Sequence, residues 1–236
     1  GDAVGNESMD RAITDGEFSQ FQALMQRVAG IHLPRSKKPL VSGRLSKRLR
    51  ARAVGSFGDY YRLIVGGHDP AELQTAIELL TTNETYFFRE PGHFEILARE
   101  IVPRVPSVGT FRAWSAASST GEEAYSIAMV LMDKLGASAS WEVFGSDING
   151  KVIEKARCAT YPTARNEDAI PADYRRRYCL RGTGAMEGRL RVTADVRERV
   201  RFAQINLNSD LKATGDFDVV FLRNVMIYFD TDMKRR

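Results

Sequence analysis

Hydrophobic side chains in the first eighty residues recur at steps of three and four, which is the spacing of one face of an α-helix. The clearest example follows a capping box formed by Thr14 and Glu17, and Gly30 closes it. No strand pattern interrupts the region, so residues 1–81 are predicted to form an all-helical domain. Three further helices are expected there: one through residues 35–52 that ends at Gly55, one that begins at Ser56, and one that begins at Asp69.

The pattern changes after Asn83, where short apolar runs alternate with amphipathic stretches. Strands that alternate with helices indicate a mainly parallel sheet covered on both faces. Residues 82–236 are therefore predicted to form a Rossmann-like α/β domain, and a glycine-rich hairpin within it predicts a small antiparallel β insertion at about 174–194. The four predicted strands of the main sheet are residues 111–117, 141–148, 200–207 and 217–224.

Composition excludes several classes of protein. The chain has no apolar run long enough to span a membrane, and its polar N-terminus lacks the apolar stretch of a signal peptide. Cys158 and Cys179 are isolated, with no nearby cysteine or histidine pair, which favours free thiols and argues against a zinc or other metal site. These features predict a cytoplasmic protein that does not insert into a membrane.

The net charge of +4 is unevenly distributed. Residues 35–52 carry eight Lys or Arg and no Asp or Glu, so the basic character is local and favours an acidic partner. The alternative interpretation is a solvated cationic face without a partner.

Small residues at 116–121 follow the first predicted strand and precede a helix, as in a nucleotide-binding unit. Gly121 is the one glycine in this turn, and no P-loop lysine follows it. Glu122 and Glu123 come next; they would repel a pyrophosphate and attract a sulfonium, which favours S-adenosylmethionine over NAD or ATP. Alternatively, both carboxylates only complement the helix dipole.

Polar residues also stand at the ends of the next two predicted strands. Asp147 suits the ribose hydroxyls of a cofactor, and the pair Asn206 and Leu207 suits an adenine edge and face. Each has a structural alternative, since an Asp at a strand end often caps the next helix and an Asn often turns the chain. Ligands of open sheets bind at the carboxyl ends of strands, so the coincidence supports a cofactor site.

Three motifs in this order are specific: LTTNETYFFRE (80–90), SAASSTGEEAYSIA (115–128) and FLRNVMIYFD (221–230). Together they resemble the chemotaxis receptor glutamate methyltransferase (CheR) family over nearly the whole chain. The resemblance implies transfer of a methyl group from S-adenosylmethionine to glutamate carboxylates of chemoreceptors, with S-adenosylhomocysteine as the other product. It also implies docking on the receptor's cytoplasmic helical region, and in some members capture of a C-terminal receptor peptide by the β insertion.

Side-chain chemistry and charge suggest substrate-binding residues, and the resemblance assigns cofactor contacts. Arg89 is expected to orient the substrate carboxylate through a forked contact, and the Tyr228 hydroxyl to assist it. The basic helix is expected to dock the receptor through Arg44, Lys47, Arg48 and Arg50. Cofactor contacts are expected from Asn83, Thr85, Arg89, Glu122, Asp147, Asn206, Leu207, Arg223 and Asn224.

The chemistry fits the absence of a histidine from these motifs. A glutamate side chain with a pKa of about 4.3 is already ionised at neutral pH, so its methylation needs no catalytic base.

Two rival functional classes stay open. A nucleic-acid methyltransferase would use the basic helix, although residues 35–52 contain no aromatic side chain for base stacking. A signalling module would bind the cofactor without turnover.

One departure from the family concerns the sheet. A methyltransferase sheet of this kind has seven strands, and the last three are not found after the strand predicted at 217–224. That strand is therefore expected to have a free edge.

Overall fold

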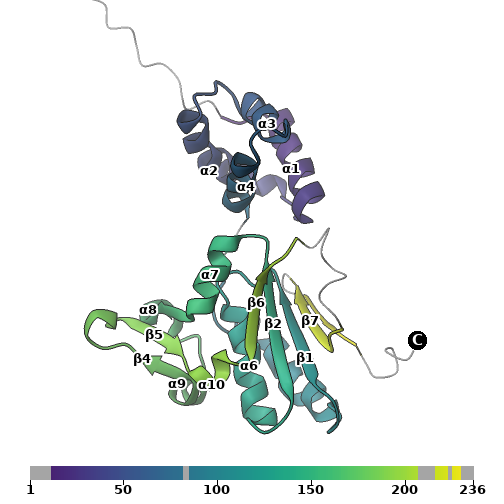
Figure 1. The fold of residues 1–236 in the computed structure, drawn as a ribbon, viewed down its shortest axis with the longest axis vertical. Coiled ribbons are helices and arrows are strands. Elements are labelled where there is room, and N and C mark those ends of the chain that lie inside the picture. The colour runs from purple at the N-terminus through teal and green to yellow at the C-terminus, as the bar shows by residue number, and fades with distance from the viewer. Residues whose placement is uncertain (1–11, 82–84, 207–215, 223–224, 230–236) are drawn as a thin grey trace, which may run out of the picture. The chain divides into compact units, whose positions relative to one another are not determined.

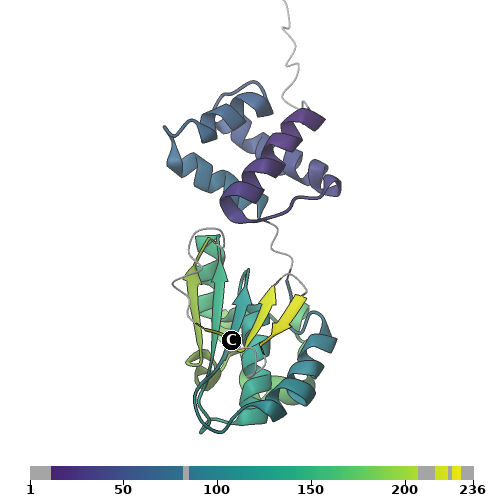
Figure 2. The same cartoon turned by 90° about the vertical axis from the view of Figure 1, so that its right-hand side faces the viewer.

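The computed structural model describes residues 12–81, 85–206, 216–222 and 225–229, which form two compact units. Residues 12–81 and Asn206 belong to the first, and residues 85–205 with 216–229 belong to the second (Figures 1 and 2). No helix in these ranges is long and apolar enough to cross a membrane.

The first unit is helical, as predicted. Thr14 and Glu17 form the capping box, and Gly30 closes the first helix at φ +65°. Ser56 and Asp69 each accept a backbone N–H at the start of a later helix, which explains where those helices begin. The helix through the basic stretch ends at Ala51, earlier than expected. The helices are α1 (Asp15–Ala29), α2 (Lys38–Ala51), α3 (Phe57–Val65) and α4 (Pro70–Leu80), with a 3₁₀ turn at Arg35–Lys37.

The second unit contains a five-stranded sheet of order β6-β2-β1-β7-β8. The strands β1, β2, β6 and β7 are parallel, as the alternation of strands and helices predicted. Their carboxyl ends therefore share one edge of the sheet. The bounds are β1 (Phe111–Ala116), β2 (Trp141–Asp147), β6 (Val200–Gln204), β7 (Val219–Leu222) and β8 (Val225–Tyr228).

The edge beside β7 differs from the expectation. β8 pairs with β7 in antiparallel register, from Leu222↔Val225 to Val219↔Tyr228. The expectation of a free edge on the fourth predicted strand is therefore wrong, because the chain reverses and covers that edge with its next segment.

The β insertion is a separate antiparallel sheet of order β3-β5-β4. The predicted hairpin is present as β4 (Cys179–Arg181) and β5 (Arg189–Val192), with a 3₁₀ turn at Gly184–Met186 between them. A third strand, β3 (Thr160–Pro162), was not predicted because three residues show no alternation. The flanking helices are α8 (Thr163–Asn166), α9 (Ala172–Tyr178) and α10 (Ala194–Arg197).

The core of the second unit lies between the sheet and α6 (Glu122–Leu135). Small and aliphatic residues of α6 are buried with Ala113, Val143 and Val219 of the sheet. The same core includes side chains of the segment before β1, which consists of α5 (Pro91–Ile96), a π-helical turn (Leu97–Ile101) and a 3₁₀ turn (Val102–Arg104). The helix α7 (Gly150–Cys158) follows β2 and contacts β2 and β6.

Candidate functional site: a cofactor turn and a docked arginine segment

The turn between β1 and α6 has an unusual backbone. Ala117 and Ser119 have φ of +60° and +51°, and Gly121 has φ +97°. Left-handed backbone costs a non-glycine residue about 1–2 kcal/mol, so this conformation needs support from its surroundings. A Cβ on Gly121 would lie 3.0 Å from both the Ala156 Cβ and the Tyr161 hydroxyl, which explains the one glycine of the turn.

Asp147 supports this turn from the end of β2. Its buried carboxylate accepts the Ser119 N–H at 2.9 Å through Oδ2 and the Asn149 N–H at 2.9 Å through Oδ1. The cap of α7 is Asn149, not Asp147, so the simple capping interpretation of Asp147 is wrong. Asp147 instead joins the ends of two neighbouring strands at the carboxyl edge of the sheet.

The two glutamates that open α6 are held differently. The buried Glu122 carboxylate accepts the Thr120 hydroxyl at 2.5 and 2.7 Å. Glu123 accepts the Ser115 hydroxyl at 2.7 Å. Burial raises the pKa of Glu123, although the Ser115 hydroxyl and the charge of Arg89 both oppose this rise. The helix start therefore carries carboxylates in a partly dehydrated setting.

Two serine hydroxyl groups of the turn are candidates for contact with a polar ligand. The Oγ atoms of Ser118 and Ser119 are buried and have no hydrogen-bond partner within the described part of the chain. Buried polar groups normally have a hydrogen-bond partner, so two buried hydroxyl groups at the carboxyl edge without one among the described residues fit a site where a polar ligand supplies the partner. With the carboxylates beside them, these residues fit S-adenosylmethionine.

Arg89 lies close to this turn because the segment before it is docked on α6. The Phe88 N–H donates to the Ser126 hydroxyl at 3.0 Å. The Phe87 ring packs edge-on against Tyr161 with centroids 4.9 Å apart, and Phe88 packs similarly on Phe94 at 5.0 Å. Arg89 itself is half-buried, 5.9 Å from the centroid of the Tyr86 ring, and its charge acts on Glu123.

The other predicted site residues fall into three groups. Thr85 is half-buried and starts the docked segment, and Asn206 lies two residues beyond the end of β6. Tyr228 pairs with Val219 at the start of β7, three residue pairs from the carboxyl edge. The structure therefore does not bring Tyr228 together with Asp147 and Arg89, and its predicted role rests on the family resemblance alone. Outside the described residues lie Asn83, Leu207, Arg223 and Asn224.

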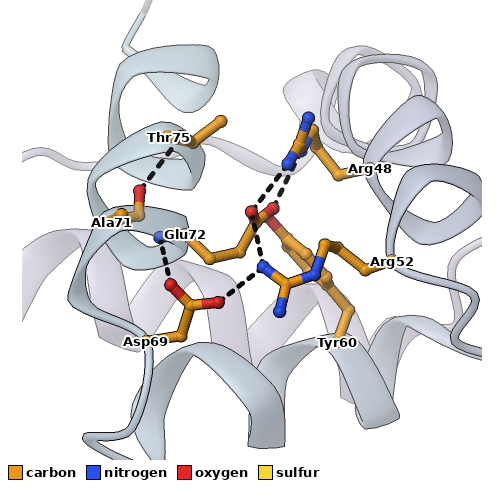
Figure 3. Close-up of polar contacts among 7 residues, drawn as sticks. All are labelled: Arg48, Arg52, Tyr60, Asp69, Ala71, Glu72 and Thr75. Atoms are coloured by element: carbon orange, nitrogen blue, oxygen red, sulfur yellow. Dashed lines mark hydrogen bonds and ion pairs between the residues drawn. The ribbon is translucent and has the colours of Figure 1, made fainter.

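Arginines of the basic helix form ion pairs within the helical unit, which the sequence did not suggest (Figure 3). Arg48 makes a two-point contact with Glu72 of α4, at 2.8 Å from Nε and 2.6 Å from Nη2. Tyr60 donates its hydroxyl to the same carboxylate at 2.8 Å. Arg52 bridges Asp69 at 2.5 Å and Glu72 at 3.1 Å. The Glu72 side chain is only 4% exposed, whereas those of Arg48 and Arg52 are 30% and 33% exposed, so partly exposed guanidinium groups cover a buried carboxylate.

Arg44 is also used internally, since it donates to the carbonyl oxygens of Leu79 and Thr81 at 2.9 and 3.4 Å. The guanidinium groups of Arg44 and Arg48 therefore hold α2 against α4, and their role in docking a partner stays a prediction. Lys47 and Arg50 are exposed on α2, three residues apart, and remain candidates for docking.

Sequence reasoning missed the residues that hold the site together. Ser126 and Tyr161 contact it from α6 and from the insertion, and the Tyr161 hydroxyl donates to the Thr120 carbonyl oxygen at 2.7 Å. A buried serine or tyrosine has no signature in sequence, so neither could be distinguished from ordinary core residues.

The fold and the site define a Rossmann-like α/β domain of the S-adenosylmethionine-dependent methyltransferase class. The family model described as "CheR methyltransferase, SAM binding domain" matches residues 83–236, and the one described as "CheR methyltransferase, all-alpha domain" matches residues 16–81. The chain belongs to the CheR methyltransferase family, and S-adenosylmethionine is its methyl donor.

Similar proteins agree with this assignment. The chain is 44% identical over 221 residues to the chemotaxis protein methyltransferase of Salmonella typhimurium, across 93% of this chain and 75% of that protein. It is 44% identical to the protein of the same name from Escherichia coli, across 93% and 76%. It is 42% identical to chemotaxis protein methyltransferase 2 of Pseudomonas aeruginosa, across 94% and 79%.

Proposed function

We propose that this chain methylates glutamate side chains of bacterial chemoreceptors in the cytoplasm, producing glutamate methyl esters. The observation that carries the proposal is the position of Arg89. Its segment is docked on the first turns of α6 through Phe88 and Ser126, beside the acidic turn that suits the cofactor. The names of the similar proteins, which are chemotaxis methyltransferases, support a chemoreceptor as substrate.

The chain's own residues then have limited tasks. When bound, S-adenosylmethionine supplies an electrophilic methyl group. Arg89 orients the ionised substrate carboxylate through its forked donors, and the aromatic packing around Phe87 and Phe88 excludes water. The substrate carboxylate is already a nucleophile at neutral pH, so alignment supplies most of the rate enhancement.

The proposal is tested by incubating the protein with methyl-labelled S-adenosylmethionine and receptor-containing membranes. We expect label on the receptor that is released as methanol by mild base, because carboxyl methyl esters are base-labile. Label on added RNA instead would indicate a nucleic-acid methyltransferase. Cofactor binding without any transfer would indicate a signalling module.

Lys47 and Arg50 are expected to dock the acidic face of a receptor helix. Reversing both charges, Lys47→Glu with Arg50→Glu, should raise the KM for receptor at least about fivefold and leave kcat within about twofold, because rim charges act mainly on encounter and docking. Steady-state kinetics with receptor membranes measures both constants.

The matched control is Arg62→Glu, which reverses an exposed charge on α3 of the same unit and should leave the KM unchanged. Arg44 and Arg48 are excluded from this test because they support the helical unit. A fall in kcat at constant KM would contradict docking by Lys47 and Arg50.

The β insertion is proposed to hold an acidic receptor peptide. β4 is an outer strand of the small sheet, so an extended peptide can pair with it. A cavity of about 220 Å³ beside β4 is lined by Arg175, Arg176 and Arg181, which suit a peptide carboxylate. Fluorescence titration with acidic and neutral peptides of equal length tests this; equal affinities would contradict it.

A further inference from the structure

We propose that Ser126 is a positioning residue for methyl transfer, which sets the conformation of the Arg89 segment relative to the cofactor turn. This inference rests on the proposed role of Arg89. Ser126 lies on α6 and its side chain is fully buried. Its hydroxyl donates to the Glu122 carbonyl oxygen at 2.7 Å and accepts the Phe88 N–H at 3.0 Å.

The two bonds use the hydroxyl in complementary ways. Because its proton is directed at the Glu122 carbonyl, its lone pairs are available to the Phe88 N–H. A serine inside a helix often donates to the carbonyl oxygen four residues back without any further role. The second bond is different, since it reaches 38 residues along the chain to the residue before Arg89. One hydroxyl therefore joins the acidic helix start to the segment that carries the substrate-orienting guanidinium.

The Arg89 segment needs such a bond because its backbone is strained. Phe88 has φ +53° and Glu90 has φ +54°, so left-handed residues stand on both sides of Arg89. An aromatic residue adopts this conformation only where its surroundings enforce it. The left-handed turn at Phe88 lets consecutive rings, Phe87 and Phe88, both be buried while Arg89 stays half-buried. Without an acceptor for its N–H, Phe88 would be free to leave this conformation.

Ser126→Ala tests the inference. We expect kcat to fall about tenfold or more at saturating cofactor, whereas affinity for S-adenosylhomocysteine, measured by isothermal titration calorimetry, should stay within about threefold. Retained binding of S-adenosylhomocysteine would show that the variant is folded around its cofactor turn. The control is Thr75→Ala on α4, which removes a hydroxyl bonded to the carbonyl oxygen four residues back and should leave kcat unchanged.

A double-mutant cycle separates positioning from general support. If Ser126 acts through Arg89, then Ser126→Ala in an Arg89→Lys background should reduce kcat much less than it does in the parent protein. Additive losses would overturn the inference, and so would loss of S-adenosylhomocysteine binding in Ser126→Ala. If Ser126→Ala keeps the wild-type kcat while Arg89→Ala is inactive, this inference is overturned and the proposed role of Arg89 stands. Wild-type turnover in Arg89→Ala would instead overturn the proposed role of Arg89.

Discussion

Arg89→Ala is expected to lower kcat at least about 100-fold, because removing a preorganised donor from a dehydrated site has effects of this size. Arg89 is half-buried beside the first turn of α6, where we propose that its guanidinium group orients the substrate carboxylate. Methyl ester formation on receptor, at saturating cofactor, measures the loss. A rate within about threefold of the parent protein would contradict the role assigned to Arg89.

The two parallel donors of the Arg89 guanidinium group are expected to contribute to the rate as well as its charge. Arg89→Lys keeps the positive charge but offers a point contact in place of two parallel donors, so we expect an intermediate rate. Arg99→Ala is the control, since Arg99 is exposed ten residues further along the chain. Affinity for S-adenosylhomocysteine should be measured for each variant, because Arg89 is also a predicted cofactor contact. A fall in kcat at saturating cofactor can then be attributed to loss of substrate orientation by Arg89.

Glu72→Ala is expected to lower the free energy of unfolding by about 3 kcal/mol, since it leaves the buried Tyr60 hydroxyl and two partly exposed arginines without their carboxylate. The Glu72 side chain is 4% exposed and receives hydrogen bonds from Arg48, Arg52 and Tyr60. Urea denaturation followed by circular dichroism measures the change. As a control, Asp59→Ala removes an exposed ion pair with Arg62 and should have a much smaller effect. Equal losses in both variants would show that the buried cluster is not special.

The same carboxylate predicts a pH dependence. Its hydrogen bond from Arg48, assisted by those from Tyr60 and Arg52, lowers the pKa of Glu72 from 4.5 to about 2. The folded protein therefore binds this proton less readily than the unfolded chain does. The contribution of Glu72, about 3 kcal/mol, is complete above about pH 4.5 and is lost as the pH falls toward 2. Glu72→Gln should flatten this part of the stability profile.

Local rules predicted much of the fold. The capping box of α1, the glycine that ends α1 and the alternation of strands with helices all depend on residues within a few positions of one another. β3 was missed because it is a three-residue strand that gains its stability from pairing with β5, which is distant in sequence. β8 was not predicted although its partner β7 is the preceding strand, and its antiparallel pairing places Tyr228 away from the carboxyl edge.

The site was predicted less evenly. Asp147 and Glu122 were found because their positions follow from strand ends and a helix start. The internal contacts of the basic helix were not predicted, because the sequence shows the charge of Arg48 but does not show that its partner is Glu72, 24 residues away. Charge runs indicate a surface only when the acidic groups that neutralise them lie elsewhere. Here Glu72 is buried beneath α2 and accepts hydrogen bonds from Arg48 and Arg52, so part of the basic run is neutralised within the helical unit.

Backbone conformation at the site bears on attempts to engineer this protein. Of the six non-glycine residues with positive φ in the described ranges, four are at the site: Phe88, Glu90, Ala117 and Ser119. At the exposed positions Glu90 and Ala117, glycine would adopt these angles without steric penalty, so a screen that rewards heat resistance would favour glycine there. Such variants would gain thermal tolerance by relaxing the two segments that hold Arg89 and the cofactor turn. Selection for robustness alone would thus erode turnover, and these four positions should be held fixed in any library.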